Sequence, residues 1–433
     1  MTSSLRLRKL TAPVQGHVHL PGSKSYTNRA LVIAALCEGK SLLRSYSPSD
    51  DSVALVAGLR KLGVDCRETK EGLEVTGRGR DFLPYRGDID VGPAGTTMRF
   101  LTSLCSLVED GDIRLCGSER MHSRPIGDLV EGWRRLGASI EYLGKDGCPP
   151  LRIQGKSNYS SHTSMPGEVS SQFFSSLLMV APLLREGLSL EVDGIQTSPS
   201  YIDMTLQTMA AFGVNVGNDN YQQYTVTPGQ TYQSRSYLVE GDASGASYFW
   251  GLAAVSGGYM KVYNLSPDSI QGDVHFADLL EQMGCIKTSG VDDGVPWITI
   301  QGPEMLQPLE ADMGSMPDTA LTMAAIAAVA NGTTTLTGLH TLRHKETDRL
   351  EALHQELKSV GIATEVGEDW LSIHGGTPHA AEIRTYEDHR MAMAMAVLAG
   401  CTDSLTILEP EVVSKSFPSF WDEWSRVGVE VVR

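Results

Sequence analysis

Cationic side chains first suggest chemistry at the junction between a strand pattern and a helix pattern near residue 24. Lys24 and Arg29 follow a Pro-Gly pair, and an apolar helix is predicted to begin near Ser25. The free amides and dipole of a helix N-terminus favour an anion, and the two cations would add to that attraction. The stretch is not a phosphate-binding P-loop, because Ser23 stands where that loop needs glycine. An ordinary helix cap beside two solvated cations is the alternative.

More cations lie near the predicted starts of other helices. Ser, Thr and Asp at such places commonly act as N-caps, and we expect that role for Thr97, Asp242 and Ser244. A capping role does not explain the cations. The forked guanidinium of arginine and the compact ammonium of lysine both suit carboxylate and phosphate groups. Together they favour a site for polyanionic small molecules. The cations in question are Lys24, Arg29, Arg99, Arg124, Arg349, Arg390 and Lys415.

Two carboxylates are candidates for acid–base chemistry. Asp318 follows Pro317 at a predicted helix start, and Glu346 lies in the charge-dense run 343–350. Such a run is often a solvated helix face, with Lys345 and Arg349 flanking an acidic residue, and that alternative stays open here. No Cys/His cluster or HExxH motif predicts a metal site, and no G-x-G-x-x-G predicts a dinucleotide site.

An internal repeat must position these residues. Helix-like segments end in hydrophobic-Gly-hydrophobic at intervals of about 70 residues, which predicts left-handed helix stops followed by strands. A second series of apolar helices ends on the same period. Hairpin-like strand pairs follow the first five repeat glycines, with second arms at 73–77, 151–155, 224–227, 297–302 and 371–375. We therefore predict six α/β copies of one unit. The repeat glycines are Gly63, Gly137, Gly213, Gly284, Gly361 and Gly428.

The sixth copy lacks its last arm, and the strand-like stretches 5–10 and 14–20 are predicted to complete it. Three copies then form a contiguous domain, 21–240. The other three form a discontinuous domain, 1–20 plus 241–433. The crossings near residues 21 and 240 are hinge candidates, and one large α/β domain is the alternative.

Composition limits the class of protein. The 433 residues are 41% hydrophobic and 20% charged, as in an ordinary globular protein of two to three domains. A net charge of -16 argues against a nucleic-acid surface. Seven scattered cysteines without a CxxC pair are typical of a reducing compartment, and neither a signal core nor a membrane span is predicted. We expect a cytoplasmic location.

The ordered motifs resemble those of the 5-enolpyruvylshikimate-3-phosphate (EPSP) synthases over the full length of the chain. The stretch 20–29 is similar to the family's signature, and the fold that the resemblance implies agrees with the six copies: a two-domain inside-out α/β barrel of six β-α-β-α-β-β units, three per domain. Further matches are Ala94-Gly95-Thr96, Arg120-Met121, Arg124-Pro125-Ile126, Ser170-Ser171-Gln172, Tyr201-Ile202-Asp203, Glu240 to Ser244, Pro317-Asp318, Lys345 to Arg349, Asp388 to Met391 and Lys415 to Pro418.

The resemblance implies transfer of the enolpyruvyl group of phosphoenolpyruvate to the 5-hydroxyl of shikimate 3-phosphate, with release of phosphate. It implies an active site in the interdomain cleft, no cofactor or metal, a monomer without nucleic-acid or membrane partners, and competition by the inhibitor glyphosate. Asp318 would take the hydroxyl proton, Glu346 would protonate the methylene carbon, and Lys24 would assist. Shikimate 3-phosphate would contact Lys24, Ser25, Arg29, Ser170, Ser171, Gln172, Ser198, Tyr201, Asp318 and Lys345. Phosphoenolpyruvate would contact Lys24, Gly95, Arg124, Gln172, Arg349, Arg390 and Lys415.

Two alternatives share the fold. UDP-N-acetylglucosamine enolpyruvyl transferase carries a reactive Cys before an Arg-Pro pair, and Cys116 does precede Arg124-Pro125, although it ends a strand pattern. A non-catalytic binding protein would not need Asp318 and Glu346. The chain also departs from the family pattern, with Pro93 and Thr341 in place of Asn and Phe100 in place of Pro.

Overall fold

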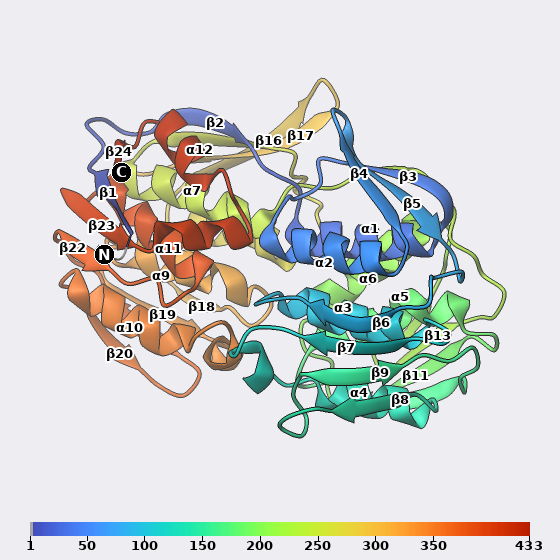
Figure 1. The fold of residues 1–433 in the computed structure, drawn as a ribbon. Coiled ribbons are helices and arrows are strands. Elements are labelled where there is room, and N and C mark those ends of the chain that lie inside the picture. Colours follow the sequence, from blue (N-terminus) through green and yellow to red (C-terminus); the bar gives the residue numbers. More distant parts are fainter. Residues whose placement is uncertain (1–2) are drawn as a thin grey trace. The chain divides into compact units, whose positions relative to one another are not determined.

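Two compact units make up the computed structural model, which describes residues 3–433 (Figure 1). Unit 1 comprises Met1–Pro21 and Glu240–Arg433, and unit 2 comprises Gly22–Val239. The buried apolar residues form one cluster inside each unit, so each has a core of its own. In the part of the chain that the structure describes, none of the helices has both the length and the apolar character needed to cross a membrane.

Each repeat is a strand, an inner helix, a second strand, an outer helix and a hairpin. The first strand pairs in parallel with the second, and the second pairs antiparallel with the last arm of the hairpin, so that six four-stranded sheets result. All six repeat glycines that follow the outer helices have φ between 84° and 106°, which confirms the predicted left-handed helix stops. The predicted six-repeat α/β fold is therefore confirmed.

Unit 2 contains three of these sheets and six α-helices. In sheet order the strands are β14 (Ser236–Leu238), β3 (Glu38–Arg44), β5 (Gly72–Arg78) and β4 (Asp65–Thr69); β6 (Arg86–Asp90), β7 (Asp112–Cys116), β9 (Leu151–Gln154) and β8 (Ser139–Tyr142); and β10 (His162–Pro166), β11 (Leu188–Asp193), β13 (Gln223–Val226) and β12 (Gly217–Asp219). The helices are α1 (Lys24–Leu36), α2 (Asp50–Lys61), α3 (Gly95–Ser106), α4 (Gly127–Arg135), α5 (Ser171–Val180) and α6 (Pro199–Ala211), with 3₁₀ turns η1 (Met121–Ser123) and η2 (Ala181–Leu183).

Unit 1 repeats this plan. Its strands in sheet order are β2 (Gln15–His19), β15 (Tyr259–Tyr263), β17 (Val295–Gln301) and β16 (Ile286–Asp292); β18 (Glu310–Asp312), β19 (Thr333–Thr337), β21 (Leu371–His374) and β20 (Ala363–Val366); and β22 (Ala381–Ile383), β23 (Ser404–Leu408), β1 (Ser4–Arg8) and β24 (Val431–Val432). Its helices are α7 (Ala243–Ser256), α8 (Phe276–Gln282), α9 (Ala320–Ala327), α10 (Arg349–Ser359), α11 (His389–Ala396) and α12 (Phe420–Arg426). The 3₁₀ turns are η3 (Gly272–His275), η4 (Pro317–Thr319), η5 (His340–His344), η6 (Val397–Gly400) and η7 (Pro410–Lys415).

The two N-terminal strands complete different sheets. β1 pairs antiparallel with β23 and β24, so it supplies the missing arm of the sixth repeat as predicted. The prediction was wrong for β2, which pairs in parallel with β15 and opens the sheet of the fourth repeat. The chain leaves unit 1 directly after β2, and β14, just before the return, takes the corresponding place beside β3 in unit 2.

The inner helices α1, α3, α5, α7, α9 and α11 are buried almost all round. A helix that is apolar on every side belongs in a protein interior, and within each unit these helices pack against one another. The lysine and arginine residues of the inner helices lie near the N-terminal ends: Lys24 and Arg29 in α1, Arg99 in α3 and Arg390 in α11.

Candidate active site

Arg349 is the centre of a polar cluster in unit 1. It is the first residue of α10, and its side chain is only 1% exposed. Its Nη1 donates to Asp318 Oδ1 at 2.9 Å, its Nη2 to Glu346 Oε2 at 2.9 Å, and its Nε to Asp388 Oδ2 at 2.7 Å. Burial lowers the pKa of Arg349, but these carboxylates raise it by more, so that it lies above its ordinary value. One buried cation thus holds three acids.

Helix starts bring these acids together. Asp388 is the N-cap of α11 and accepts from the Arg390 amide at 2.9 Å. Asp318 lies in η4, the turn that leads into α9, and Glu346 precedes α10. The helices α9, α10 and α11 pack against one another, so their N-terminal ends converge.

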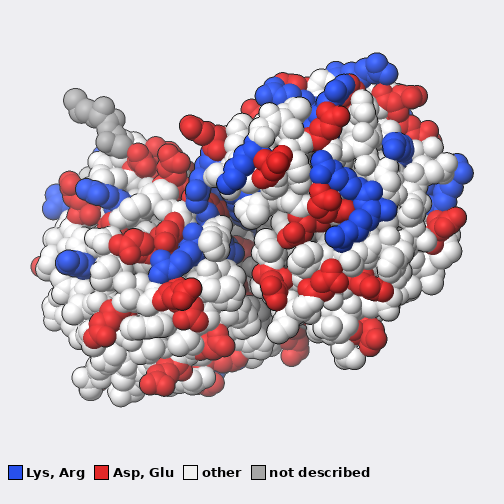
Figure 2. All heavy atoms as spheres, turned by 90° about the horizontal axis from the view of Figure 1, so that it is seen from below, with Lys and Arg blue, Asp and Glu red and all other residues white. Residues whose placement is uncertain are grey.

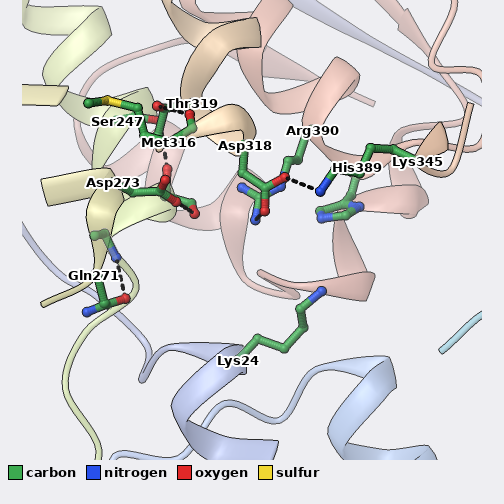
Figure 3. Close-up of polar contacts among 12 residues, drawn as sticks. Lys24, Ser247, Gln271, Asp273, Met316, Asp318, Thr319, Lys345, His389 and Arg390 are labelled. Carbon is green, nitrogen blue, oxygen red and sulfur yellow. Dashed lines mark hydrogen bonds and ion pairs between the residues drawn. The ribbon is translucent and has the colours of Figure 1, made fainter. Parts of the chain in front are cut away.

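Asp318 contacts two more cations besides Arg349. Arg390 Nη2 lies 3.0 Å from Oδ2, and Lys345 Nζ lies 3.7 Å from Oδ1 (Figure 3). Burial raises the pKa of Asp318, but Arg390, Lys345 and Arg349 lower it by more, and it falls well below its ordinary value. The three cations therefore hold Asp318 as an ionised carboxylate.

Glu346 completes the cluster through Lys415. The ammonium of Lys415, a buried residue at the end of η7, donates to Glu346 Oε1 at 2.7 Å. We call the seven side chains joined in this way the unit 1 cluster. It contains four cations and three carboxylates, so one positive charge is left over among the directly paired groups, which favours an anionic ligand. Its members are Asp318, Lys345, Glu346, Arg349, Asp388, Arg390 and Lys415.

The run 343–350 is not a solvated helix face. Asp348 caps α10 and pairs with Arg343, whose Nη1 lies 2.9 Å from Asp348 Oδ2. Arg349 turns into the unit instead of pairing along the helix surface. The alternative of i,i+4 pairs with Lys345 and Arg349 on either side of Asp348 is therefore wrong, because the polar interior that receives Arg349 exists only once α9 and α11 are packed.

Two predicted helix caps have other roles. Thr97 Oγ1 donates to the Asp51 carbonyl at 2.7 Å and so ties α3 to α2. Ser244 Oγ donates to the carboxylate of Asp273. Asp242 does occupy the N-cap position of α7, but without a capping side-chain hydrogen bond.

Lys24 begins α1 in unit 2. Its Nζ lies 3.3 Å from Oδ2 of Asp51, whose side chain is only 3% exposed in the first turn of α2. Asp51 Oδ1 is buried without a hydrogen-bond partner among the described residues. A buried carboxylate thus holds the Lys24 ammonium at the start of α1, and Ser25 follows directly.

Arg29 makes its hydrogen bonds inside unit 2. It is therefore not the solvated cation that the sequence left open as an alternative. Its Nε donates to Thr205 Oγ1 at 2.7 Å, and its Nη2 donates to the Tyr201 carbonyl at 2.9 Å and to Ser175 Oγ at 3.2 Å. Nη1 donates to the Ser25 carbonyl at 3.0 Å. Burial lowers the pKa of Arg29 to about 10, so it stays charged at neutral pH. These bonds tie α1 to α5 and α6, and a ligand contact would have to replace some of them.

Gly95, Arg124 and Gln172 lie together at the starts of α3 and α5. The guanidinium of Arg124 covers Gly95, where an added Cβ would lie 2.5 Å from Nη1 and 2.8 Å from Cζ. Gln172 Nε2 donates to Thr96 Oγ1 at 3.4 Å and links the two helix starts. A cation, an amide and a helix N-terminus in one place suit an anion.

Replacing Gly95 by alanine is expected to raise the KM for phosphoenolpyruvate, the substrate that the family resemblance implies at this glycine, about tenfold, which corresponds to roughly 1.4 kcal/mol of binding. The new methyl group would overlap the Arg124 guanidinium, which must then move away. Steady-state kinetics with varied phosphoenolpyruvate would measure the change. Gly127→Ala, also at a helix start, is the control, because its added Cβ meets nothing closer than 3.4 Å. Equal KM values in both variants would contradict a role for the space at Gly95.

The predicted serines flank α5 and α6. Ser170 is the N-cap of α5 and accepts from the Gln172 amide at 3.3 Å, and Ser171 is buried at the first helical position. Ser198 precedes α6 with φ of 49°, a left-handed conformation that is uncommon for serine and recurs at functional sites. The Tyr201 ring lies 5.9 Å from the Arg29 guanidinium carbon.

Three acids were not assigned to the site from the sequence. Asp51 holds Lys24, Asp388 holds Arg349, and Asp273 bonds Ser244. The signal for Asp388 was its place before a helix that carries Arg390, which is the position of a cap. The segments around Asp51 and Asp273 carry no comparable signal.

The departures from the family pattern lie near these groups. Pro93 is exposed in the turn before α3. Phe100 is buried, and the Arg29 guanidinium carbon lies 5.7 Å from the centre of its ring. Thr341 Oγ1 is buried and without a hydrogen-bond partner among residues 3–433.

Cys116 has the environment of a structural thiol. It ends β7, and its Sγ donates to the Ile89 carbonyl at 3.7 Å. Burial and then Asp90 raise the pKa of Cys116, which is the opposite of what activates a nucleophilic cysteine. In the described part of the chain no group of three or more His, Cys, Asp or Glu side chains is arranged to hold a metal ion.

The six-repeat inside-out α/β fold is that of the enolpyruvyl transferases. The structure is similar over 100% of both chains to an EPSP synthase from Acinetobacter baumannii (25% identity, TM-score 0.85). In fold it also resembles the enolpyruvyl transferase NikO from Streptomyces tendae (15% identity, TM-score 0.76, 100% of this chain and 99% of that one).

Within this class, sequence comparison points to one family. A family model described as EPSP synthase (3-phosphoshikimate 1-carboxyvinyltransferase) matches residues 9–424. The 3-phosphoshikimate 1-carboxyvinyltransferases of Yersinia pestis bv. Antiqua (strain Angola) and Pectobacterium carotovorum subsp. carotovorum (strain PC1) are each 43% identical, with 99% of each chain covered. The chain belongs to the EPSP synthase family of transferases. These comparisons favour 3-phosphoshikimate 1-carboxyvinyltransferase activity over the UDP-N-acetylglucosamine alternative.

Proposed function

We propose that the protein transfers the enolpyruvyl group of phosphoenolpyruvate to the 5-hydroxyl of shikimate 3-phosphate by addition and elimination. Membership of the family supports the reaction. One observation supports the residue roles. Arg349 makes ion pairs with Asp318 and Glu346, the two proposed catalytic carboxylates, within a cluster that has one more positive than negative charge. Both substrates carry phosphate and carboxylate groups, which are the partners that such cations select.

In the addition step the 5-hydroxyl oxygen forms a bond to C2 of phosphoenolpyruvate. Asp318 takes the hydroxyl proton, and Glu346 delivers a proton to the methylene carbon, so that a tetrahedral adduct with a methyl group forms. In the elimination step the methyl group gives one proton back, and the bond from C2 to the phosphate oxygen breaks. Inorganic phosphate leaves with the electron pair and takes up the proton that Asp318 had accepted, while the methyl proton returns to Glu346, so both carboxyl groups regain their starting states. No other reactant is needed to balance the step.

Substrate binding would prepare both carboxylates for these roles. In the unit 1 cluster Asp318 pairs with Lys345, Arg349 and Arg390, and a carboxylate held so strongly is a poor base. Phosphate and carboxylate groups of the substrates would compete for the same cations. Each cation drawn to a substrate raises the proton affinity of the carboxylate that it leaves.

The substrate contacts are proposed as the family resemblance assigns them. For its contact, Arg29 would exchange some of the hydrogen bonds that it makes inside unit 2, such as those to the Ser25 and Tyr201 carbonyls. Shikimate 3-phosphate would contact Lys24, Ser25, Arg29, Ser170, Ser171, Gln172, Ser198, Tyr201, Asp318 and Lys345. Phosphoenolpyruvate would contact Lys24, Gly95, Arg124, Gln172, Arg349, Arg390 and Lys415.

We also propose that the three-repeat domain 21–240 contributes most shikimate 3-phosphate contacts, while 1–20 plus 241–433 contributes the catalytic carboxylates. The enzyme would act as a monomer without a nucleic-acid partner. The net charge of -16 supports the absence of a nucleic-acid partner, as does the face drawn in Figure 2, where acidic and basic side chains are interspersed.

Phosphate release tests the proposal. Phosphoenolpyruvate with shikimate 3-phosphate should give one phosphate per enolpyruvyl ether, and phosphoenolpyruvate with UDP-N-acetylglucosamine should give none. Release with the sugar nucleotide alone would replace the proposal by the alternative transferase. Tight binding of both shikimate-pathway substrates without release would indicate a binding protein.

A further inference from the structure

Asp273 is a buried acid that the proposed reaction does not use. It lies in η3 and is 5% exposed, and its carboxylate accepts a hydrogen bond from Ser244 Oγ at the start of α7. The turn η3 packs against α7, α8 and η4, and η4 carries Asp318. Figure 3 shows Asp273 and Asp318 on neighbouring segments, with the Arg390 guanidinium beside Asp318.

The charged and titratable groups around Asp273 come from each of these elements. Asp242 and Tyr248 lie on α7, and the Tyr248 hydroxyl accepts from Arg390 Nη1 at 3.2 Å. Asp318 lies on η4 and pairs with Arg390 of α11. On α8, Asp278 pairs with Lys287 and with His275, which lies in η3 itself. Arg390 is therefore a cation that three acids, Asp318, Asp242 and Asp273, have in common, and Asp318 makes the direct ion pair with it.

Two carboxyl groups beside one buried arginine compete for the ionised form. Burial and then the charge of Asp318 raise the pKa of Asp273 to about 7, while Arg390 and the Ser244 hydrogen bond lower it by less. Asp318 has the direct ion pair with Arg390 and is held ionised. The environments thus push the proton affinities of the two acids apart, which is how paired carboxyl groups acquire different roles.

We propose that Asp273 is a positioning residue that holds the proton of the Asp273–Asp318 pair, so that Asp318 stays the ionised base and Arg390 stays available to an anionic substrate. This rests on the proposed function, because Asp318 and Arg390 matter only if they handle the substrates. When Asp273 loses its proton, a second negative charge competes for Arg390. Binding of phosphoenolpyruvate should then weaken.

Kinetics of Asp273→Asn against pH test the proposal. Asparagine keeps the shape and can still accept from Ser244, but it cannot ionise. Between pH 6 and pH 8 the protonated fraction of a group titrating near 7 falls about tenfold. We expect the KM for phosphoenolpyruvate of the wild type to rise by a similar factor over this range, with a smaller change in kcat. In Asp273→Asn this rise should be absent.

Ser244→Ala is the matched variant, and it should shift the pH dependence of the KM instead of removing it. It removes a hydrogen bond that favours the ionised form of Asp273, so the rise in KM should move to higher pH than in the wild type. Superimposable pH profiles for the wild type and Asp273→Asn would overturn the proposal. A shift to lower pH in Ser244→Ala would also overturn it.

A measurement without substrates separates this inference from the proposed reaction. The folded state binds the Asp273 proton more tightly than the unfolded state does, where Asp titrates near 3.9. Wild-type stability should therefore fall, relative to Asp273→Asn, as pH rises from about 4 to about 7, and the difference should be constant above pH 8. Parallel melting temperatures across that range would refute the proton-holding role even if the enzyme is active. Absence of phosphate release, with the stability difference present, would refute only the proposed reaction.

Discussion

Replacing Arg349 by methionine is expected to lower the free energy of unfolding by about 3–5 kcal/mol at pH 7 and to abolish transferase activity. The change leaves Asp318, Glu346 and Asp388 without the buried cation that holds all three, and removing one partner from a buried ion-pair network has a cost of this size. Urea unfolding followed by circular dichroism would measure it. The deficit should shrink towards acidic pH, because unpaired buried carboxylates take up protons in the folded state.

An exposed arginine provides the control for Arg349. Arg152 also makes a forked pair with a carboxylate, Asp112, at 2.8 Å for both bonds, but its side chain is 43% exposed. Arg152→Met should lower the free energy of unfolding far less than Arg349→Met does, because exposed ion pairs contribute little to stability. Similar unfolding curves for the two variants would mean that burial of Arg349 does not have the energetic role argued for it.

Asp318→Asn and Glu346→Gln are each expected to lower kcat by a factor of about 10²–10⁴, the usual effect of losing a positioned acid or base. Both proteins should remain folded. Asp318→Asn should still cost about 1–3 kcal/mol, because Lys345, Arg349 and Arg390 lose a charged partner. Phosphate release under saturating substrates measures the rate, and thermal melting measures the stability.

The control for these variants is Asp312→Asn, an exposed residue in β18, which precedes η4. Its carboxylate accepts from the Gly314 amide at 2.8 Å, a bond that asparagine can also make. This variant should turn over like the wild type. Turnover within about threefold of wild type in Asp318→Asn or Glu346→Gln would remove that residue from its assigned role.

The repeat could be predicted from the sequence because its signals are local. A glycine such as Gly137 just past an outer helix stops it with a positive φ whatever else the chain does, and the same signal recurs six times. The destination of β2 could not be predicted in this way. Its residue pattern predicts a strand but does not specify a partner, which in the folded unit 1 is β15.

Side-chain partners were the least predictable part of the site. Arg349 and Lys345 stand in the same charged run, yet one is buried among carboxylates and the other is about one-third exposed. Arg29 was correctly placed at a helix start, but its donors bond Thr205 and Tyr201, which are more than 170 residues away in sequence. A sequence pattern fixes which face a residue is on, whereas its partners depend on which helices arrive opposite it.

The pairing of β1 with β23 has a consequence for synthesis on the ribosome. The first strand to emerge finds its antiparallel neighbour only after residues 404–408 have been made, while all twelve strands of the three unit 2 sheets lie within residues 22–239. Unit 2 can therefore fold while the chain is still growing. The partner of β2, β15, is made soon after unit 2, at residues 259–263, but β1 must wait unpaired until translation is almost complete. At about 5–20 residues per second, the roughly 200 residues after unit 2 impose a delay of about 10–40 s. During that time β1 is an unpaired strand that chaperones and neighbouring nascent chains can bind.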